Sequence, residues 1–266
     1  MMKIVNRRLA WCAAAACLTA LSGGLALADT IAQWTFEVSI PATAGPHAAE
    51  VGTGTAVGFH ANGAAVYSNP VGNGSVESFS SNTWTVGDYY EFNVSTTGYN
   101  TITLDWDQTS SNTGPRDFQL SYSTDGVNYS PIGGVYVVLA NATPNPVWST
   151  ATPQPIFHFG PIAAPAAVDN QATVSFRLVD SSAISANGGA VAAAGTDRVD
   201  NFTINGTVIS TSCPGDLNGD RTVDSSDLGI LLSAWETTSA GDLDGDGITS
   251  SSDLGILLAA WLSVCP

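Results

Sequence analysis

The stretch DLNGDRTVDSSDLGILLSAW at residues 216–235 returns at residues 242–261 as DLDGDGITSSSDLGILLAAW. The offset is 26 residues, and it carries Asp227 onto Asp253 and Trp235 onto Trp261 without a gap. Each copy begins with alternating oxygen-bearing residues and continues into a segment rich in leucine. A repeat at a fixed spacing predicts two copies of one structural unit. We therefore expect the C-terminal region to fold as a pseudo-symmetric pair.

The spacing of the oxygens in each copy matches a calcium-binding loop. Such a loop has twelve residues and binds the ion through positions 1, 3, 5, 7, 9 and 12, with position 7 using its backbone carbonyl. Two unrelated acidic turns would have to match this spacing twice. The sequence therefore predicts two Ca²⁺ sites. The predicted ligands are Asp216, Asn218, Asp220, the carbonyl of Thr222, Asp224 and Asp227 in the first loop, and Asp242, Asp244, Asp246, the carbonyl of Ile248, Ser250 and Asp253 in the second.

Only the segment after each loop is expected to be helical, at residues 228–235 and 254–261, because residues 212–215 and 238–241 are turn-like. A duplicated loop–helix unit with Asp at position 12 resembles the type I dockerin, and the flanking Cys213 and Cys265 resemble those of GC-type dockerins. The resemblance implies an EF-hand-like module that folds with calcium and binds a cohesin-type domain. Dockerins of this kind are known from polysaccharide catabolic processes.

The resemblance also implies a docking surface. In the family, loop positions 10 and 11 contact the cohesin, and both copies carry the same residues there, so a partner is expected to bind in either of two orientations. One departure is Arg221, which replaces the glycine expected at position 6. A left-handed backbone there costs about 1 kcal/mol, so we expect the first loop to bind calcium less tightly than the second. The implied contact residues are Ser225, Ser226, Ser251, Ser252, Leu228 and Leu254.

Residues 1–28 have the layout of a secretory signal peptide. Three basic residues precede an apolar stretch at 9–21, and Ala26-Leu27-Ala28 gives a small-residue cleavage site. The stretch is too short to span a bilayer, so we expect a secreted protein, extracellular or on the cell surface, without membrane insertion. The mature chain keeps only Cys213 and Cys265, and an even pair in an exported protein predicts a disulfide.

The charge excludes one class of partner. The whole chain has a formal charge of −16, and loss of Lys3, Arg7 and Arg8 with the signal peptide lowers it to −19. No lysine then remains. Because binding to nucleic acid depends on cations that neutralise phosphates, we expect no nucleic-acid partner.

Residues 29–210 are expected to form a β-sandwich, and residues 211–266 the dockerin. Apolar and polar residues alternate, so Ile102, Leu104 and Trp106 share one face and are expected in the core. The predicted fold is mainly β, a jelly-roll-like antiparallel sandwich followed by a small α-helical module. Six prolines within 141–170 predict a long surface loop. Expected strands lie at 31–37, 76–84, 89–94, 100–108, 172–180 and 201–209 and within 116–126.

The stretches SYSTDGVNYSPIG (121–133) and RVDNFTINGTV (198–208) resemble bacterial surface sandwich modules, the group that includes choice-of-anchor and carbohydrate-binding jelly-roll domains. The resemblance implies binding of a polysaccharide or another surface component, and a further calcium ion held by Glu37 and Asp200. Aromatic rings stack on sugars, and we expect Trp148 and one of the adjacent pair Tyr89 and Tyr90 to be exposed for this purpose.

The sequence carries little sign of catalysis. The chain contains no G-x-S-x-G motif, and its three histidines, His47, His60 and His158, are far apart. We therefore expect a secreted, non-catalytic protein that is attached outside the cell through a dockerin–cohesin interaction and whose sandwich binds glycan or a surface component. Two alternatives stay open, a glycoside hydrolase delivered by its dockerin and a purely structural surface protein.

Overall fold

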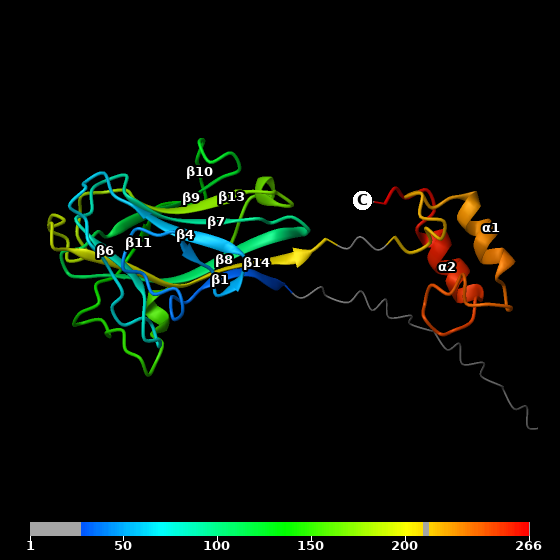
Figure 1. Cartoon of the computed structure of the whole chain (residues 1–266), viewed down its shortest axis with the longest axis horizontal. Helices are drawn as coiled ribbons and strands as arrows, with labels where there is room; N and C mark the ends of the chain where they lie inside the picture. The colour runs from blue at the N-terminus through cyan, green and yellow to red at the C-terminus, as the bar shows by residue number, and fades with distance from the viewer. Residues whose placement is uncertain (1–27, 210–212, 266) are drawn as a thin grey trace, which may run out of the picture.

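The computed structural model describes residues 28–209 and 213–265. Residues 1–27 of the predicted signal peptide lie outside this range. The strands of a β-sandwich occupy residues 29–208, and a small module with two α-helices follows (Figure 1). The predicted fold class, mainly β with an α-helical C-terminal module, is confirmed. Neither helix in the described part of the chain is long and apolar enough to cross a bilayer.

The first sheet, which we call sheet A, joins the first strand of the sandwich to its last. Trp34 pairs with Phe202 in an antiparallel ladder, and the other half of the last strand pairs with β6. The order is β12-β8-β14-β1-β3, with β5 on the far side of β6. The strands are β1 (Asp29–Trp34), β3 (Val51–Gly52), β5 (Tyr67–Ser68), β6 (Phe79–Asn82), β8 (Tyr99–Ser110), β12 (His158–Ala163) and β14 (Thr196–Val208).

The second sheet, sheet B, has the order β10-β9-β13-β7-β4-β2, and β11 also pairs with β9. All its ladders are antiparallel. A tight turn at Asp125-Gly126 follows β9, and Gly126 has the positive φ, 72°, that such a turn requires. The strands are β2 (His47–Ala48), β4 (Gly54–Phe59), β7 (Tyr89–Val94), β9 (Asp117–Ser123), β10 (Ser130–Pro131), β11 (Tyr136–Val137) and β13 (Val174–Asp180).

The core lies between the inner faces of the two sheets. Phe92 of sheet B stacks on Phe202 of sheet A, with ring centroids 3.6 Å apart, and Trp34 packs edge-on against both rings. Burial of each such side chain stabilises the fold by about 1.5–3 kcal/mol. The predicted core face of Ile102, Leu104 and Trp106 is fully buried, as expected.

Several predictions for the sandwich were wrong: one strand was missed, one was too long, and one expected loop contains a strand. The segment GTAVGF forms β4, which was not expected, and β1 ends at Trp34 because Phe36 has a φ of 59°. The proline-rich segment is not one long loop, since it contains β12 and the 3₁₀ turns η1 (Pro155–Phe157) and η2 (Ala166–Val168). Pro161 lies in β12 where its ladder with β8 shifts register, at an edge of the sheet that tolerates a residue without an N–H.

The C-terminal module has helices α1 (Ser225–Ser233) and α2 (Ser251–Ala259), which begin three residues earlier than predicted. Capping boxes explain the early start. Asp224 accepts from the N–H of Ser226, and Asp227 accepts in return from the N–H of Asp224. Ser250 and Asp253 repeat this arrangement at α2. A cap of this kind is worth about 1 kcal/mol.

Candidate functional site

The two predicted calcium loops have the same local geometry. Asp216 at position 1 accepts hydrogen bonds from the N–H groups of Gly219 at 2.8 Å and Arg221 at 3.0 Å. In the second loop, Asp242 accepts from Gly245 at 2.7 Å and Gly247 at 2.8 Å. The repeat in sequence is therefore a repeat in structure, down to individual hydrogen bonds.

Position 12 joins each loop to its helix. The carboxylate of Asp227 is buried and accepts from the N–H groups of Leu217, Asn218 and Asp224. Burial opposes its ionisation, but these three donors outweigh burial and lower the pKa of Asp227. Asp253 is held in the same way, and the N–H of Ser250 is the main cause of its lowered pKa. The residue that completes the loop is thus also the residue that caps the helix.

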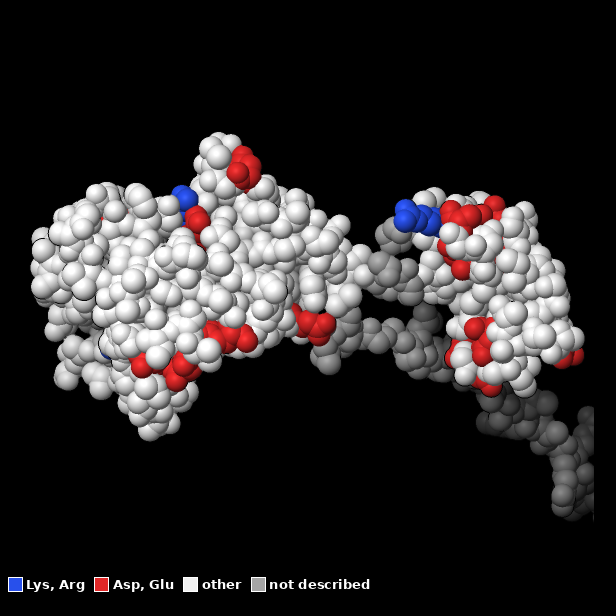
Figure 2. Space-filling view, in the orientation of Figure 1, with Lys and Arg blue, Asp and Glu red and all other residues white. Residues whose placement is uncertain are grey.

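The second loop gathers three carboxylates. Ligand oxygens of Asp242, Asp244 and Asp246 all lie within 4.8 Å of one another, on the surface of the module. Like charges this close repel unless a cation lies between them, and an all-oxygen donor set suits calcium. The residues present therefore fit the predicted ion. Figure 2 shows acidic side chains gathered on this face of the module.

Among the predicted side-chain ligands and position 6, the first loop differs from the second at positions 3, 6 and 9. Asn218 replaces the carboxylate of position 3 and donates to Asp220 at 2.9 Å, but Asp224 adds a carboxylate at position 9, where the second loop has Ser250. Each loop therefore has four Asp residues, and the first is less negative only because it contains Arg221. At position 6, Arg221 has a φ of 71°, and its counterpart Gly247 has 91°. The left-handed backbone that the sequence predicted for Arg221 is confirmed.

The two repeats contact each other around a pseudo-twofold axis. The N–H of Glu236, after α1, donates to Thr249 of the second loop at 3.0 Å, and the N–H of Leu262, after α2, donates to Val223 of the first loop at 2.9 Å. Leu231 and Leu257, at equivalent positions, are fully buried in the shared core. A disulfide joins Cys213 to Cys265, as predicted.

The implied docking residues are divided between surface and core. Ser225, Ser226, Ser251 and Ser252 are all exposed in the first turns of the helices. Leu228 and Leu254 are half-buried and pack against the module core, whereas Leu232 and Leu258 are 53% and 52% exposed. Of the two equivalent tryptophans, Trp235 packs against the core, whereas Trp261 is 37% exposed. The helices therefore expose Leu232 and Leu258 more than the predicted contact residues Leu228 and Leu254.

In the sandwich, Glu37 and Asp200 hold the same segment. The exposed Glu37 accepts from the N–H of Glu77 at 2.7 Å, and the buried Asp200 accepts from the N–H of Asn73 at 2.8 Å and the hydroxyl of Ser75 at 2.7 Å. Burial raises the pKa of Asp200 to about 7. Both carboxylates therefore bind residues 73–77, so each holds this segment against sheet A.

Two of the three aromatic candidates are not exposed. Trp148 is only 3% exposed, because its segment folds back so that the ring packs edge-on against Phe157 and under the guanidinium of Arg198. Tyr90 is buried in the core, where its hydroxyl donates to the carbonyl of Asp197. The expectation for Trp148 was wrong, and within the tyrosine pair only Tyr89 reaches the surface.

Tyr89 belongs to a set of stacked side chains on the outer face of sheet B, which we call the aromatic platform. It consists of Phe59, Tyr89, Arg177 and Tyr129. Phe59 stacks on Tyr89 at 4.9 Å, and the Arg177 guanidinium lies between the rings of Tyr89 and Tyr129, at 3.8 and 3.5 Å. Glu91 fixes this arrangement by accepting from Arg177 at 2.6 Å and from the Tyr129 hydroxyl at 2.7 Å. Phe59 is 46% exposed and gives the platform an open ring.

Sequence reasoning missed Phe59, because β4 was not expected. The register of β4 against β7, which pairs Phe59 with Tyr89, is what brings the two rings together.

A Ser-His-Asp arrangement is also present inside the sandwich. His60 Nε2 lies 2.8 Å from Ser81 Oγ, and His60 Nδ1 lies 2.9 Å from Asp88 Oδ2. The three side chains are buried, so the serine has no access to a substrate, and burial lowers the pKa of His60. A nucleophile needs an open approach for the reacting carbon. We therefore assign these hydrogen bonds to the structure of the core.

No family model matches the chain, and no curated protein matches it. Solved structures similar to the sandwich include an adhesin domain of Lys-gingipain from Porphyromonas gingivalis, with 13% identity, a TM-score of 0.39, and coverage of 65% of this chain and 95% of that one. A xylan-binding domain from Paenibacillus barcinonensis has 12% identity and a TM-score of 0.36, and the match covers 66% of this chain and 98% of that domain. A xylanase from Clostridium thermocellum, in complex with xylohexaose, has 14% identity and a TM-score of 0.41. The match covers 74% of this chain and 32% of the xylanase. The function is argued below from this chain's own residues.

Proposed function

We propose that the chain is a secreted, non-catalytic protein that is attached to a cohesin-type partner by a calcium-binding module and binds glycan through its sandwich. The observation that carries the attachment is the pair of superposable loops, in which equivalent carboxylates make equivalent hydrogen bonds. A duplicated oxygen array joined directly to a helix cap has a clear physical use, because an ion in the loop would also order the start of the helix.

Calcium would be held by the oxygens of the two loops, and the ion would supply the positive charge that the clustered carboxylates lack. Because ion binding to such loops is coupled to folding, calcium should stabilise the module rather than only occupy it. The two loops should also differ in their affinity for calcium. Arg221, through its left-handed backbone and its positive charge, should make the first loop the weaker of the two.

Calcium titration of the full chain by isothermal calorimetry tests this proposal. We expect two ions per chain, with the tighter site lost in Asp242→Asn and the weaker site lost in Asp216→Asn. Chelation should lower the helical circular dichroism signal and leave the sandwich folded. Fewer than one bound ion, together with helicity that a chelator does not change, would contradict the proposal.

Docking would use the exposed serine pairs with Leu232 and Leu258. Since the two repeats present equivalent surfaces, loss of one leaves the other orientation available. Replacing Ser225 and Ser226 with Glu should weaken cohesin binding only about twofold, or about 0.4 kcal/mol, and the same holds for Ser251 and Ser252. Changing all four should abolish binding. If either double variant alone abolishes it, the partner uses a single orientation.

Glycan binding would use the aromatic platform, because a flat, exposed ring on a rigid support is suited to stack on a sugar ring. Retention of the full chain on a panel of insoluble polysaccharides measures this. Phe59→Ala and Tyr89→Ala should release the chain, whereas Tyr67→Ala, a half-buried tyrosine of sheet A, should not. Reducing sugar released from the same panel would instead favour the glycoside hydrolase, and no retention at all would favour a structural surface protein.

A further inference from the structure

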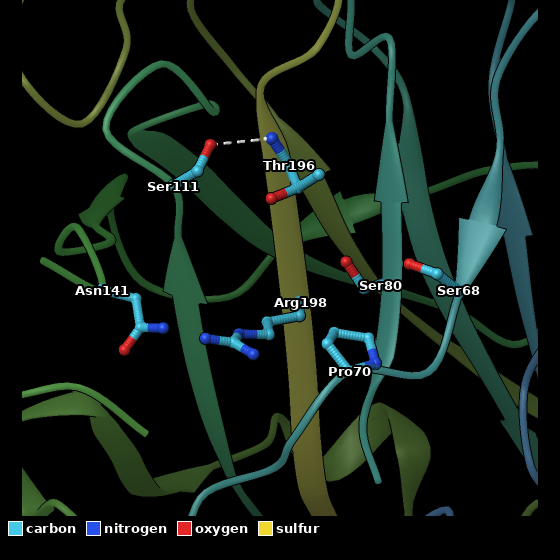
Figure 3. Close-up of a pocket in the computed structure, with 7 residues that line it drawn as sticks. All are labelled: Ser68, Pro70, Ser80, Ser111, Asn141, Thr196 and Arg198. Carbon is cyan, nitrogen blue, oxygen red and sulfur yellow. Dashed lines mark hydrogen bonds between the residues drawn. The ribbon is translucent and has the colours of Figure 1, made fainter. Parts of the chain in front are cut away.

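Sheet A carries a pocket on its outer face, away from the aromatic platform. Its volume is about 260 Å³. It lies where β14, β6 and β5 run side by side, and the segment after β11 closes its other side (Figure 3). Residues from five separate segments line it: Ser68, Pro70, Ser80, Ser111, Asn141, Thr196 and Arg198.

The only charge in the lining belongs to Arg198. Figure 3 shows its side chain extending from β14 across the pocket toward Asn141. One N–H of the guanidinium donates to the carbonyl of Val71 at 2.8 Å, and the Trp148 ring lies 5.0 Å from the guanidinium carbon. A guanidinium has five donors. Most of its hydrogen-bonding capacity therefore has no partner among the described residues.

Arg198 also lacks the counter-charge that the other two arginines of the sandwich have. Arg116 is paired with Asp117, and Arg177 with Glu91. Within residues 28–209 and 213–265, no carboxylate lies within salt-bridge distance of Arg198. Burial lowers its pKa, against the opposing influence of Asp197 and Asp200, but a guanidinium stays charged. A half-buried cation without a partner is costly unless a ligand supplies the anion.

The rest of the lining is neutral and rich in hydroxyl groups. Three serines, one threonine and one asparagine surround Arg198, and no acid lines the pocket. Some of these groups already have partners within the protein. Ser111 Oγ accepts from the N–H of Thr196 at 2.9 Å, the buried Ser80 hydroxyl donates to the carbonyl of Asp197 at 3.0 Å, and Asn141 Oδ1 accepts from the N–H of Trp148 at 2.7 Å. The hydroxyls of Ser68 and Thr196 and the side-chain NH₂ of Asn141 have no partner among the described residues, and they offer donors and acceptors that sugar hydroxyls match.

We propose that this pocket binds the carboxylate of a single acidic sugar residue, with Arg198 as its anchor. A carboxylate can take two parallel N–H bonds from a guanidinium, and Ser68, Thr196 and the NH₂ of Asn141 would meet the sugar hydroxyls. The pocket has room for one sugar ring rather than for a chain. The negative charge of the whole protein is screened beyond about 10 Å at 0.1 M salt, so the contact at Arg198 decides binding.

This site goes beyond the platform and does not depend on it, because it lies on the other sheet and selects for charge. The probe is D-glucuronate, with its methyl ester and D-glucose as neutral analogues, titrated into the full chain and followed by NMR. We expect the acid to bind at least about tenfold more tightly than the ester, or about 1.4 kcal/mol. Arg198→Gln should remove that preference, and Arg198→Lys should keep part of it, because lysine keeps the charge and loses the paired donors.

Two further variants guard against a folding defect. Arg116→Gln removes an arginine that is already paired, and should bind glucuronate like the parent chain. Ser68→Tyr fills the pocket from its exposed edge with Arg198 intact, and should weaken binding at least about tenfold, or about 1.4 kcal/mol. Equal binding of acid and ester, no binding of the acid, or unchanged binding in Arg198→Gln and Ser68→Tyr overturns the proposal. If instead the aromatic platform does not bind glycan, the chain would not be retained on neutral polysaccharide, but it would still bind glucuronate.

Discussion

Replacing Arg221 with glycine should strengthen calcium binding at the first loop. Arg221 occupies loop position 6 with a φ of 71°, and the second loop has Gly247 at the same position with a φ of 91°. The strain at Arg221 belongs to the folded loop, because the unfolded chain does not have to adopt this backbone. If calcium binding and loop folding are coupled, relief of the strain should appear as tighter binding.

The magnitude follows from the surroundings of position 6. A Cβ added to Gly247 would meet nothing within 4 Å, so the cost of a side chain there is confined to the backbone. A left-handed non-glycine residue costs roughly 1–2 kcal/mol, and the greater freedom of glycine in the unfolded chain offsets roughly 0.4–1 kcal/mol. The net gain for Arg221→Gly is about 1 kcal/mol, which corresponds to roughly a fivefold change in affinity.

Isothermal titration of the full chain with calcium measures this change. Arg221→Ala is the matched control, because it removes the positive charge beside the loop but keeps a Cβ on a left-handed backbone. Gly247→Ala is the mirror experiment, and should weaken the second site by a similar factor. Equal affinities for Arg221→Gly and Arg221→Ala would show that charge, and not backbone strain, separates the two loops, and the reasoning would fail.

Further predictions concern the disulfide and the sandwich. Cys265→Ser opens a loop of 52 residues and should destabilise the module by about 4 kcal/mol, which denaturant unfolding in calcium measures; an unchanged midpoint would argue against it. Burial raises the pKa of Asp180 to about 7, above its ordinary value, so the folded state keeps a proton that the unfolded state loses between about pH 4 and 7. Stability of the sandwich should therefore fall as pH rises through that range, and Asp180→Asn should flatten the dependence seen by thermal unfolding; an equally steep profile would contradict this. Gly72→Ala should unfold the 69–77 segment, because its Cβ would lie 2.3 Å from the Asp200 carboxylate and 2.2 Å from the Glu77 carbonyl; limited proteolysis should cut there, and a resistant variant would refute the prediction.

The features that could be predicted from the sequence are those set by local spacing. The matching geometry of residues 216–227 and 242–253 depends on twelve consecutive residues in each copy, and the burial of Trp106 depends on strict alternation with Ile102 and Leu104. The loop geometry requires a left-handed backbone at position 6, so the strain at Arg221 could be predicted from the identity of that one residue. In each case the physical cause lies within one segment.

The features that were missed depend on contacts between distant segments. β4 contains Gly54 and Gly58, which disfavour a strand, and it forms one because it pairs with β7 on one side and β2 on the other. Trp148 is buried by the fold of its own proline-rich segment against sheet A, which no periodicity reveals. The unpaired charge of Arg198 becomes visible only when five segments are placed around it.

The pairing of β1 with β14 has a kinetic consequence. A hydrogen bond between Thr30 and Asn205 joins residues 175 positions apart, so sheet A cannot close until nearly the whole sandwich is available. Folds dominated by such distant contacts form slowly, on the millisecond to second scale. Until then the inner face of β1, with Ala32 and Trp34, has no cover and is prone to aggregate. Because the chain is synthesised from its N-terminus, β1 must remain unfolded, or be held by a chaperone, until β14 has been made.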